Sequence, residues 1–324
     1  MRIGIVGAGA IGGWIGVLLA QQSHELSVLA RGNALESLRA APWRLTFQGA
    51  SLEAKVAASD SPALLGTQDI LVIAVKGPAL AGVAQIIRPM IGADTIVIPA
   101  MNGVPWWFLL AGAGSLAPTG LESVDPDGTI ARAIPLASVI GCVVHASAHV
   151  SAPGAVIHHG GNKLILGAPG GGTSQRLQSL CELFSQAGFG IVQSPSIRHD
   201  IWYKLWGNMT MNPISAFTGA TCDRILDDEL VRDFVLRVMA EAAEIGKRVG
   251  CEIHERGENR IAVTRQLGAF KTSMLLDAEQ GRPLEIDGIV AAPQEIGRLV
   301  GVPTPCLDTV LGLTRLYARN RGLY

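Results

Sequence analysis

The chain carries little charge of either sign and lacks a long apolar run. Of its 324 residues, 16% are charged, and the formal net charge is −1. A domain that binds nucleic acid needs a basic surface, so we expect no nucleic-acid partner. No apolar run reaches the ~20 residues that a membrane-spanning helix requires, so we expect no membrane segment.

Cysteine is scarce too. The five cysteines are odd in number and form no C-x-x-C pair. This pattern is typical of reduced thiols, so we expect a cytoplasmic protein. The seven histidines show no metal-ligand spacing, and we therefore expect no metal site.

The most informative motif lies at the start of the chain. Residues 2–12 read RIGIVGAGAIG, in which an apolar strand leads directly into G-x-G-x-x-G and an apolar helix. In such a turn Gly7 permits the tight bend, Gly9 lets the backbone approach a pyrophosphate, and Gly12 lets the helix pack against its strand. A purely structural glycine turn is the alternative. The predicted nucleotide loop consists of Gly7, Ala8, Gly9, Ala10, Ile11 and Gly12.

The end of the second strand indicates which dinucleotide binds. An NAD site carries an acidic residue there, about 20 residues past the glycines, which binds the ribose 2′-hydroxyl. This chain has Ala30 and then Arg31. A guanidinium binds a 2′-phosphate through charge-assisted hydrogen bonds, whereas a carboxylate would repel it. We therefore predict NADP(H) as the cofactor; a solvated loop arginine is the alternative.

The order of elements predicts an α/β N-terminal Rossmann-type dinucleotide-binding domain and an all-α C-terminal domain. Short apolar strands first alternate with helices, which is typical of a parallel sheet. From about residue 197 helical spacing dominates. We place the domains at residues 1–195 and 196–324. The predicted strands are residues 3–6, 26–29, 70–75, 95–99, 139–144 and 190–193, and residues 155–167 read as two strands joined by a glycine turn.

A polar stripe stands out in the helical part. Lys204, Asn208 and Asn212 are spaced four residues apart. On a helix each such step turns the side chain by about 40°, so all three share one face. A cation and two amides within an apolar stretch favour a ligand site, with a solvated helix face as the alternative. Pro213 follows, and we expect it to kink or end the helix.

Two further candidates follow apolar strands. Lys76 comes directly after residues 70–75, and Asn102 comes closely after residues 95–99. Both positions are strand ends at which open α/β sheets bind ligands. An ordinary exposed lysine and an Asn-Gly turn are the alternatives.

Taken together, these residues resemble the ketopantoate reductase (2-dehydropantoate 2-reductase) family over essentially the whole chain. The specific motifs are the W-x-K-x3-N-x3-N-P run that starts at Trp202 and the S-M-L-x-D and E-I-D blocks that start at Ser273 and Glu285. The resemblance implies NADPH dependence, a Rossmann domain and a helical C-terminal domain. It also implies two catalytic residues: Lys204 as the general acid, and Glu285 as an anchor for Lys204 or the cofactor ribose.

The same resemblance assigns roles to the remaining candidates. Asn208, Asn212 and Ser273 would hold the hydroxyl and carboxylate of the substrate. Asn102 would lie near both the nicotinamide and the substrate, and Lys76 would help to close the site over the cofactor.

The sequence thus predicts an enzyme, an NADP-dependent oxidoreductase that reduces 2-dehydropantoate to (R)-pantoate for pantothenate and coenzyme A biosynthesis. Its partner is a small 2-oxo acid, and a homodimer is left open. One alternative is a family paralogue that reduces another 2-oxo acid. The other is a non-catalytic NADPH sensor, which would have no need of Lys204 as a proton donor.

Overall fold

The chain forms two compact units. The computed structural model describes residues 1–114 and 116–324. The first unit consists of Met1–Met101 and Thr129–Ile197, and the second of Asn102–Gly128 and Arg198–Tyr324. The domain boundary expected near residue 195 stays a prediction. The second unit also contains the segment Asn102–Gly128, which the sequence analysis placed in the first domain.

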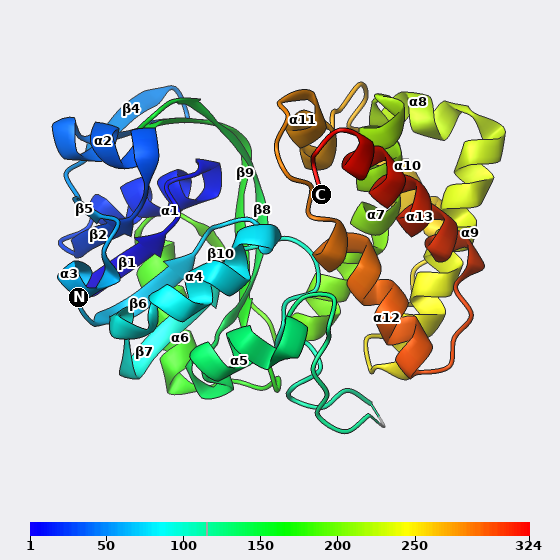
Figure 1. Ribbon diagram of the computed structural model, residues 1–324, viewed down its shortest axis with the longest axis horizontal. Helices are drawn as coiled ribbons and strands as arrows, with labels where there is room; N and C mark the ends of the chain where they lie inside the picture. Colours follow the sequence, from blue (N-terminus) through cyan, green and yellow to red (C-terminus); the bar gives the residue numbers. More distant parts are fainter. Residues whose placement is uncertain (115) are drawn as a thin grey trace. The chain divides into compact units, whose positions relative to one another are not determined.

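A parallel sheet forms the centre of the first unit (Figure 1). Its strand order is β5-β2-β1-β6-β7, and every neighbouring pair is parallel. Renumbered along the chain, this order is the 3-2-1-4-5 of a dinucleotide-binding sheet, so the predicted Rossmann-type fold is confirmed. The bounds are β1 Arg2–Val6, β2 Glu25–Leu29, β5 Ala57–Ser59, β6 Gln68–Ile73 and β7 Ile91–Pro99.

Helices and short 3₁₀ turns connect these strands. The apolar residues of the middle strands are buried, as expected of a parallel sheet whose two faces are both covered. The helices are α1 Ala10–Ala20, α2 Gly32–Ala40, α3 Pro62–Leu65, α4 Leu80–Ile86 and α5 Thr129–Ala133; the turns are η1 Gly77–Ala79, η2 Arg88–Met90 and η4 Leu136–Ser138. A further turn, η3 Pro126–Gly128, belongs to the second unit.

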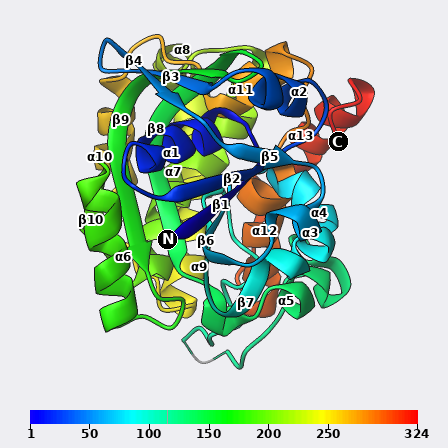
Figure 2. The ribbon, with the colours of Figure 1, turned by 90° about the vertical axis from the view of Figure 1, so that its left-hand side faces the viewer.

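A second sheet lies across α1 from the first. Its strand order is β10-β9-β3-β4, and β8 pairs with β9. Helix α1 contacts β1 and β2 on one side and β3, β8 and β9 on the other, and Figure 2 shows it beside the long β8 and β9 strands. The bounds are β3 Trp43–Phe47, β4 Ala50–Ala54, β8 Gly141–Ala152, β9 Ala155–Gly167 and β10 Gly190–Gln193, with helix α6 at Gln175–Gln186.

Two strand predictions were wrong here. Residues 155–167 form one strand, not two, because Gly161 (φ +70°) lies within β9 where its pairing with β8 shifts register. Strand β8 pairs antiparallel with β9 and does not join the parallel sheet. Only the preceding residue, Val139, forms a parallel bridge, to Val97 of β7.

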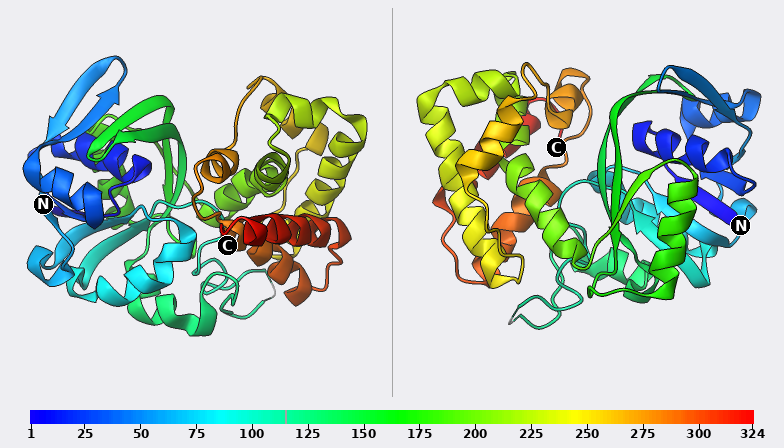
Figure 3. Two further views of the ribbon diagram at one scale, coloured as in Figure 1. Left: turned by 45° about the horizontal axis from the view of Figure 1, so that its top comes forward. Right: turned by 180° about the vertical axis from the view of Figure 1, so that it is seen from behind.

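The second unit is helical, as predicted, and Figure 3 shows it from two sides. Helix α9 contacts α8, α10, α12 and α13, and therefore lies among the other helices. Two indole N–H groups of α7 donate to backbone carbonyls of α9, from Trp202 to Ala242 and from Trp206 to Met239. The bounds are α7 Ile197–Thr218, α8 Cys222–Asp227, α9 Glu229–Arg248, α10 Gly257–Arg265, α11 Ser273–Glu279, the π-helical turn η5 Asp287–Ala291, α12 Ala292–Leu299 and α13 Pro305–Asn320.

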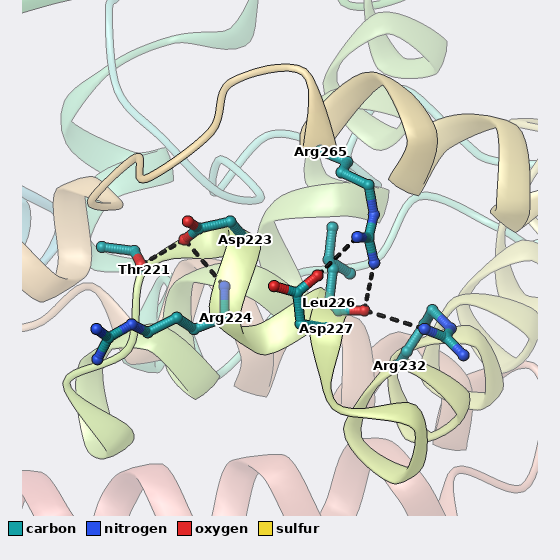
Figure 4. A network of polar contacts seen from close by, with 7 residues as sticks. All are labelled: Thr221, Asp223, Arg224, Leu226, Asp227, Arg232 and Arg265. Atoms are coloured by element: carbon teal, nitrogen blue, oxygen red, sulfur yellow. Dashed lines mark hydrogen bonds and ion pairs between the residues drawn. The ribbon is translucent and has the colours of Figure 1, made fainter.

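Arginine side chains bind a carbonyl oxygen at the C-terminal end of α8. Figure 4 shows Arg265 of α10 and Arg232 of α9 both donating to the carbonyl oxygen of Leu226, and Arg265 also pairing with Asp227. The carbonyls of a last helical turn have no partner within the helix, and arginines are favourable there. These contacts join α8, α9 and α10.

Pro213 does not end its helix, which was one of the two expected outcomes; the other, a kink, stays a prediction. Helix α7 continues through Pro213 to Thr218. The proline removes one backbone donor, but α7 is buried over most of its surface and fixed to α9 by its two tryptophans. Tertiary packing therefore outweighs the lost hydrogen bond. No helix in the described part of the chain is long and apolar enough to span a bilayer.

Candidate active site

The glycine turn has the geometry that the motif predicts. Gly7 has φ +102°, and its N–H donates to the carbonyl oxygen of Leu29 at the end of β2 (3.0 Å). A Cβ at Gly12 would lie 2.0 Å from the carbonyl oxygen of Gly7, so only glycine fits there. Gly9 caps α1, and a Cβ there would have open space around it. The turn thus presents a helix N-terminus with room for a phosphate.

Arg31 stands beside this turn. It follows β2 and caps the N-terminus of α2, so it lies at the same sheet edge as Gly7. Its side chain is exposed and makes no hydrogen bond or ion pair with the residues that the structure describes. The guanidinium is therefore available to an anion at the carboxyl edge of the sheet.

Lys76 lies at the same carboxyl edge. It follows β6 and precedes the turn η1, and its side chain is half-buried. The structure thus brings together three elements of the predicted cofactor site, namely the glycine loop, Arg31 and Lys76, at the ends of β1, β2 and β6. Open α/β sheets bind nucleotides at this edge.

A second cluster lies in the helical unit. Lys204, Asn208 and Asn212 are all on α7, which is continuous over this range, so they share one face as predicted. Asn212 is 5% exposed. Within the described chain, neither Asn208 nor Asn212 makes a side-chain hydrogen bond. Each amide offers a carbonyl oxygen and an NH₂ group to a ligand.

Asn102 joins this cluster from a distant part of the sequence. The ammonium of Lys204 donates to its amide oxygen at 2.9 Å. Both side chains are half-buried. An amide oxygen on an ammonium favours its charged form and fixes the direction of its remaining N–H groups.

The last two candidates lie further along the helical unit. Ser273 is the first residue of α11, and its neighbour Thr272 caps that helix by accepting from the N–H of Leu275. The hydroxyl of Ser273 is exposed and makes no hydrogen bond within the described residues. Glu285 is half-buried and lies just before η5, where its carbonyl accepts from the N–H of Ile289.

A charged group beside α7 was missed by the sequence analysis. The guanidinium of Arg260 lies 5.6 Å from the ring centroid of Tyr203 and packs against Gly207. The hydroxyl of Tyr203 donates to Glu255. The pKa of Tyr203 is raised mainly by burial and also by this carboxylate. Helix α10 has no apolar periodicity that would have indicated which way Arg260 points. Its charge flanks the face that carries Lys204.

No cluster of three metal-binding side chains occurs among residues 1–114 and 116–324.

The comparisons with known proteins agree with this arrangement. The family model "Ketopantoate reductase PanE/ApbA" matches residues 3–171, and its C-terminal model matches residues 196–318. A 2-dehydropantoate 2-reductase of Mesorhizobium japonicum is 43% identical, with both chains covered in full. A crystal structure of a candidate ketopantoate reductase from Ralstonia solanacearum is 56% identical, with a TM-score of 0.96 and coverage of 100% and 99%.

More distant structures share the fold alone. A D-mandelate dehydrogenase solved with NADH is 22% identical, with a TM-score of 0.85 and full coverage of both chains. The matched models and relatives confirm the family, the enzyme class and the cofactor expected from the sequence. The chain belongs to the ketopantoate reductases, a family of NADP-dependent oxidoreductases that act on 2-oxo acids.

Proposed function

We propose that the protein reduces 2-dehydropantoate to (R)-pantoate with NADPH, a step of pantothenate and coenzyme A biosynthesis. The observation that carries the proposal is the Lys204–Asn102 contact. It lies on a helix face with two amides that make no side-chain hydrogen bond to any residue the structure describes. The 43% identical relative carries the name of this activity.

The residues of the first unit fit NADPH. The open space at Gly9 and the N-terminus of α1 suit a pyrophosphate, and the unpartnered Arg31 suits a 2′-phosphate. Lys76 adds positive charge at the same edge. When bound, NADPH supplies a hydride to the ketone carbon.

The residues of the second unit fit the remaining chemistry. As the ketone becomes an alkoxide, the ammonium of Lys204 stabilises the negative charge and donates a proton to that oxygen. The amides of Asn208 and Asn212 bind the substrate hydroxyl and carboxylate, together with the hydroxyl of Ser273. Glu285 orients Lys204 or binds the cofactor ribose. Arg260 adds positive charge beside a site for an anionic acid.

A substrate panel tests the proposal. NADPH oxidation is followed with three substrates. They are 2-dehydropantoate, a branched 2-oxo acid without the hydroxyl group of 2-dehydropantoate, and an aromatic 2-oxo acid. We expect kcat/KM to be highest for 2-dehydropantoate by at least about tenfold, because a site amide that loses its hydroxyl partner is left unpaired. A preference for the aromatic acid would favour a paralogue, and no turnover with any acid would favour a sensor.

We also propose that the enzyme is a cytoplasmic homodimer. A Staphylococcus aureus ketopantoate reductase of the same fold is described as dimeric (22% identity, TM-score 0.77). The described cysteines are all free thiols, as expected of a reducing compartment. Light scattering coupled to gel filtration measures the oligomeric state, and a monomer at micromolar concentration would refute the dimer.

A further inference from the structure

Two glycine backbones touch directly beside the Lys204–Asn102 pair. Gly103 has φ +83°, and a Cβ there would lie 2.5 Å from the carbonyl carbon of Gly288 and 2.6 Å from its oxygen. The next residue, Val104, donates its N–H to that oxygen at 2.7 Å. The segment that carries Asn102 is thus fixed to the π-helical turn η5.

The sequence explains why the Gly288 carbonyl is available. In η5 the N–H of Ala292 donates to the carbonyl of Asp287, which is the π-helical pattern. The corresponding donor for Gly288 would be residue 293, which is a proline and has no N–H. The Gly288 oxygen therefore lacks a π-helical partner and accepts from Val104 instead. Single π-helical turns are rare and are often found at functional sites.

The turn is also held from its other side. The hydroxyl of Tyr324 donates to Asp287 at 2.7 Å, and the N–H of Leu284 donates to the carbonyl of Leu323 at 3.0 Å. Glu285 lies between these two anchor points. The position of Gly288, against which Asn102 and its neighbours rest, is therefore also fixed by the C-terminal residues Leu323 and Tyr324.

We propose that the Gly103–Gly288 contact is a positioning device that holds the amide oxygen of Asn102 on the ammonium of Lys204. The inference rests on the proposed role of Lys204 as the general acid. Carbon atoms normally approach no closer than about 3.5 Å, so a side chain at position 103 would displace the segment by about 1 Å. The 2.9 Å hydrogen bond of Asn102 would then lengthen beyond hydrogen-bonding range.

The decisive variant is Gly103→Ala, and the chain offers a matched control. Gly112 lies in the same segment with φ +80°, but a Cβ there would meet nothing closer than 3.9 Å. Both substitutions strain the backbone equally, and only the first disturbs the contact. We expect Gly103→Ala to lower kcat by at least about tenfold with little change in KM, and Gly112→Ala to stay within about twofold of wild type.

The pH profile separates positioning from general damage. An ammonium that loses a hydrogen-bond acceptor gives up its proton more readily. The alkaline limb of kcat should move to lower pH in Gly103→Ala and stay in place in Gly112→Ala. Pro293→Ala restores an N–H that competes for the Gly288 carbonyl and should shift the limb in the same direction, even if Gly103→Ala does not fold.

A double variant shows whether Gly103 acts through Asn102. In an Asn102→Ala background, Gly103→Ala should lower kcat by less than about twofold, because the two losses are not additive. An undiminished effect in that background, or a wild-type pH limb in Pro293→Ala, would overturn the inference. If Lys204→Ala retains full activity, the role of Lys204 fails instead.

Discussion

At the scale of single residues, the proposed general acid is the ammonium of Lys204. Lys204→Ala should lower kcat by at least about 10²-fold, the size expected for a lost general acid. Because the ammonium stabilises the developing alkoxide more than the bound ketone, KM should change little. Lys204→Arg keeps the charge but is a poor proton donor, so it should recover only part of the loss. Steady-state kinetics with the best 2-oxo acid measure both variants, and turnover within about threefold of wild type in Lys204→Ala would contradict the assignment.

We propose that another single residue, Arg31, sets the choice between NADPH and NADH. Arg31→Ala should weaken NADPH binding by ~1.5–3 kcal/mol, the range for hydrogen bonds to charged groups, and leave NADH binding nearly unchanged. Arg39 of α2 supplies the control, because it is exposed and forms an ion pair with Asp60. Arg39→Ala should change the affinity for neither cofactor. Fluorescence titration gives the dissociation constants. Equal losses for NADPH and NADH would show that Arg31 does not contact the 2′-phosphate.

Short-range sequence patterns predicted most residues of the candidate site. The glycine turn and the strand-end positions of Arg31 and Lys76 follow from short-range rules, because their geometry is set by the strand that precedes them. The Lys204–Asn102 contact joins residues 102 positions apart, and no local pattern encodes it. Arg260 and Gly288 were missed for the same reason, since their importance comes from what packs against them.

At the scale of elements, one carboxylate joins two helices. Glu241 of α9 accepts from the N–H groups of Cys306 and Leu307 at the start of α13, each at 2.9 Å. Glu241→Ala leaves both donors without a partner and should lower the free energy of unfolding by ~1–3 kcal/mol. Glu244 on the same helix forms an exposed pair with Arg248, and its removal should cost less than ~0.5 kcal/mol. Urea denaturation measures the free energy of unfolding of both variants. Equal losses would show that the two hydrogen bonds accepted by Glu241 contribute little.

The elements themselves were predictable where pattern and packing agree. The parallel strands β1 and β6 are continuous apolar runs, the long helix α9 has apolar residues at helical spacing, and the structure has all three. The turn expected at Gly161 and a helix end at Pro213 did not occur, because each residue acts through a local preference of only about 1–3 kcal/mol. The buried surroundings of α7 and the long pairing of β8 with β9 exceed that preference.

At the scale of the whole molecule, buried thiols link stability to alkaline pH. Burial raises the pKa of Cys222 and of Cys251 to about 11. Unfolded cysteines ionise near ~8.5, so the folded state holds these protons more tightly. This stabilisation is complete below the unfolded pKa and is lost as pH rises through about 11. The urea midpoint should fall over this range, and a Cys222→Ala/Cys251→Ala variant should show a shallower fall. If the urea midpoint falls equally with pH in the variant and in wild type, these thiols do not cause the loss of stability.

The segment Asn102–Gly128 has a consequence for the order in which the protein acquires its structure. The ribosome releases this segment early, yet it packs with helices that are synthesised only after residue 197. The buried side chains of this segment include Trp106, Trp107 and Phe108. During translation they therefore lack the helices against which they pack in the folded protein. A fragment that begins at Arg198 would lack these aromatic rings and would expose the apolar surface that they cover. The helical unit therefore completes its packing only after the residues beyond 197 have been synthesised.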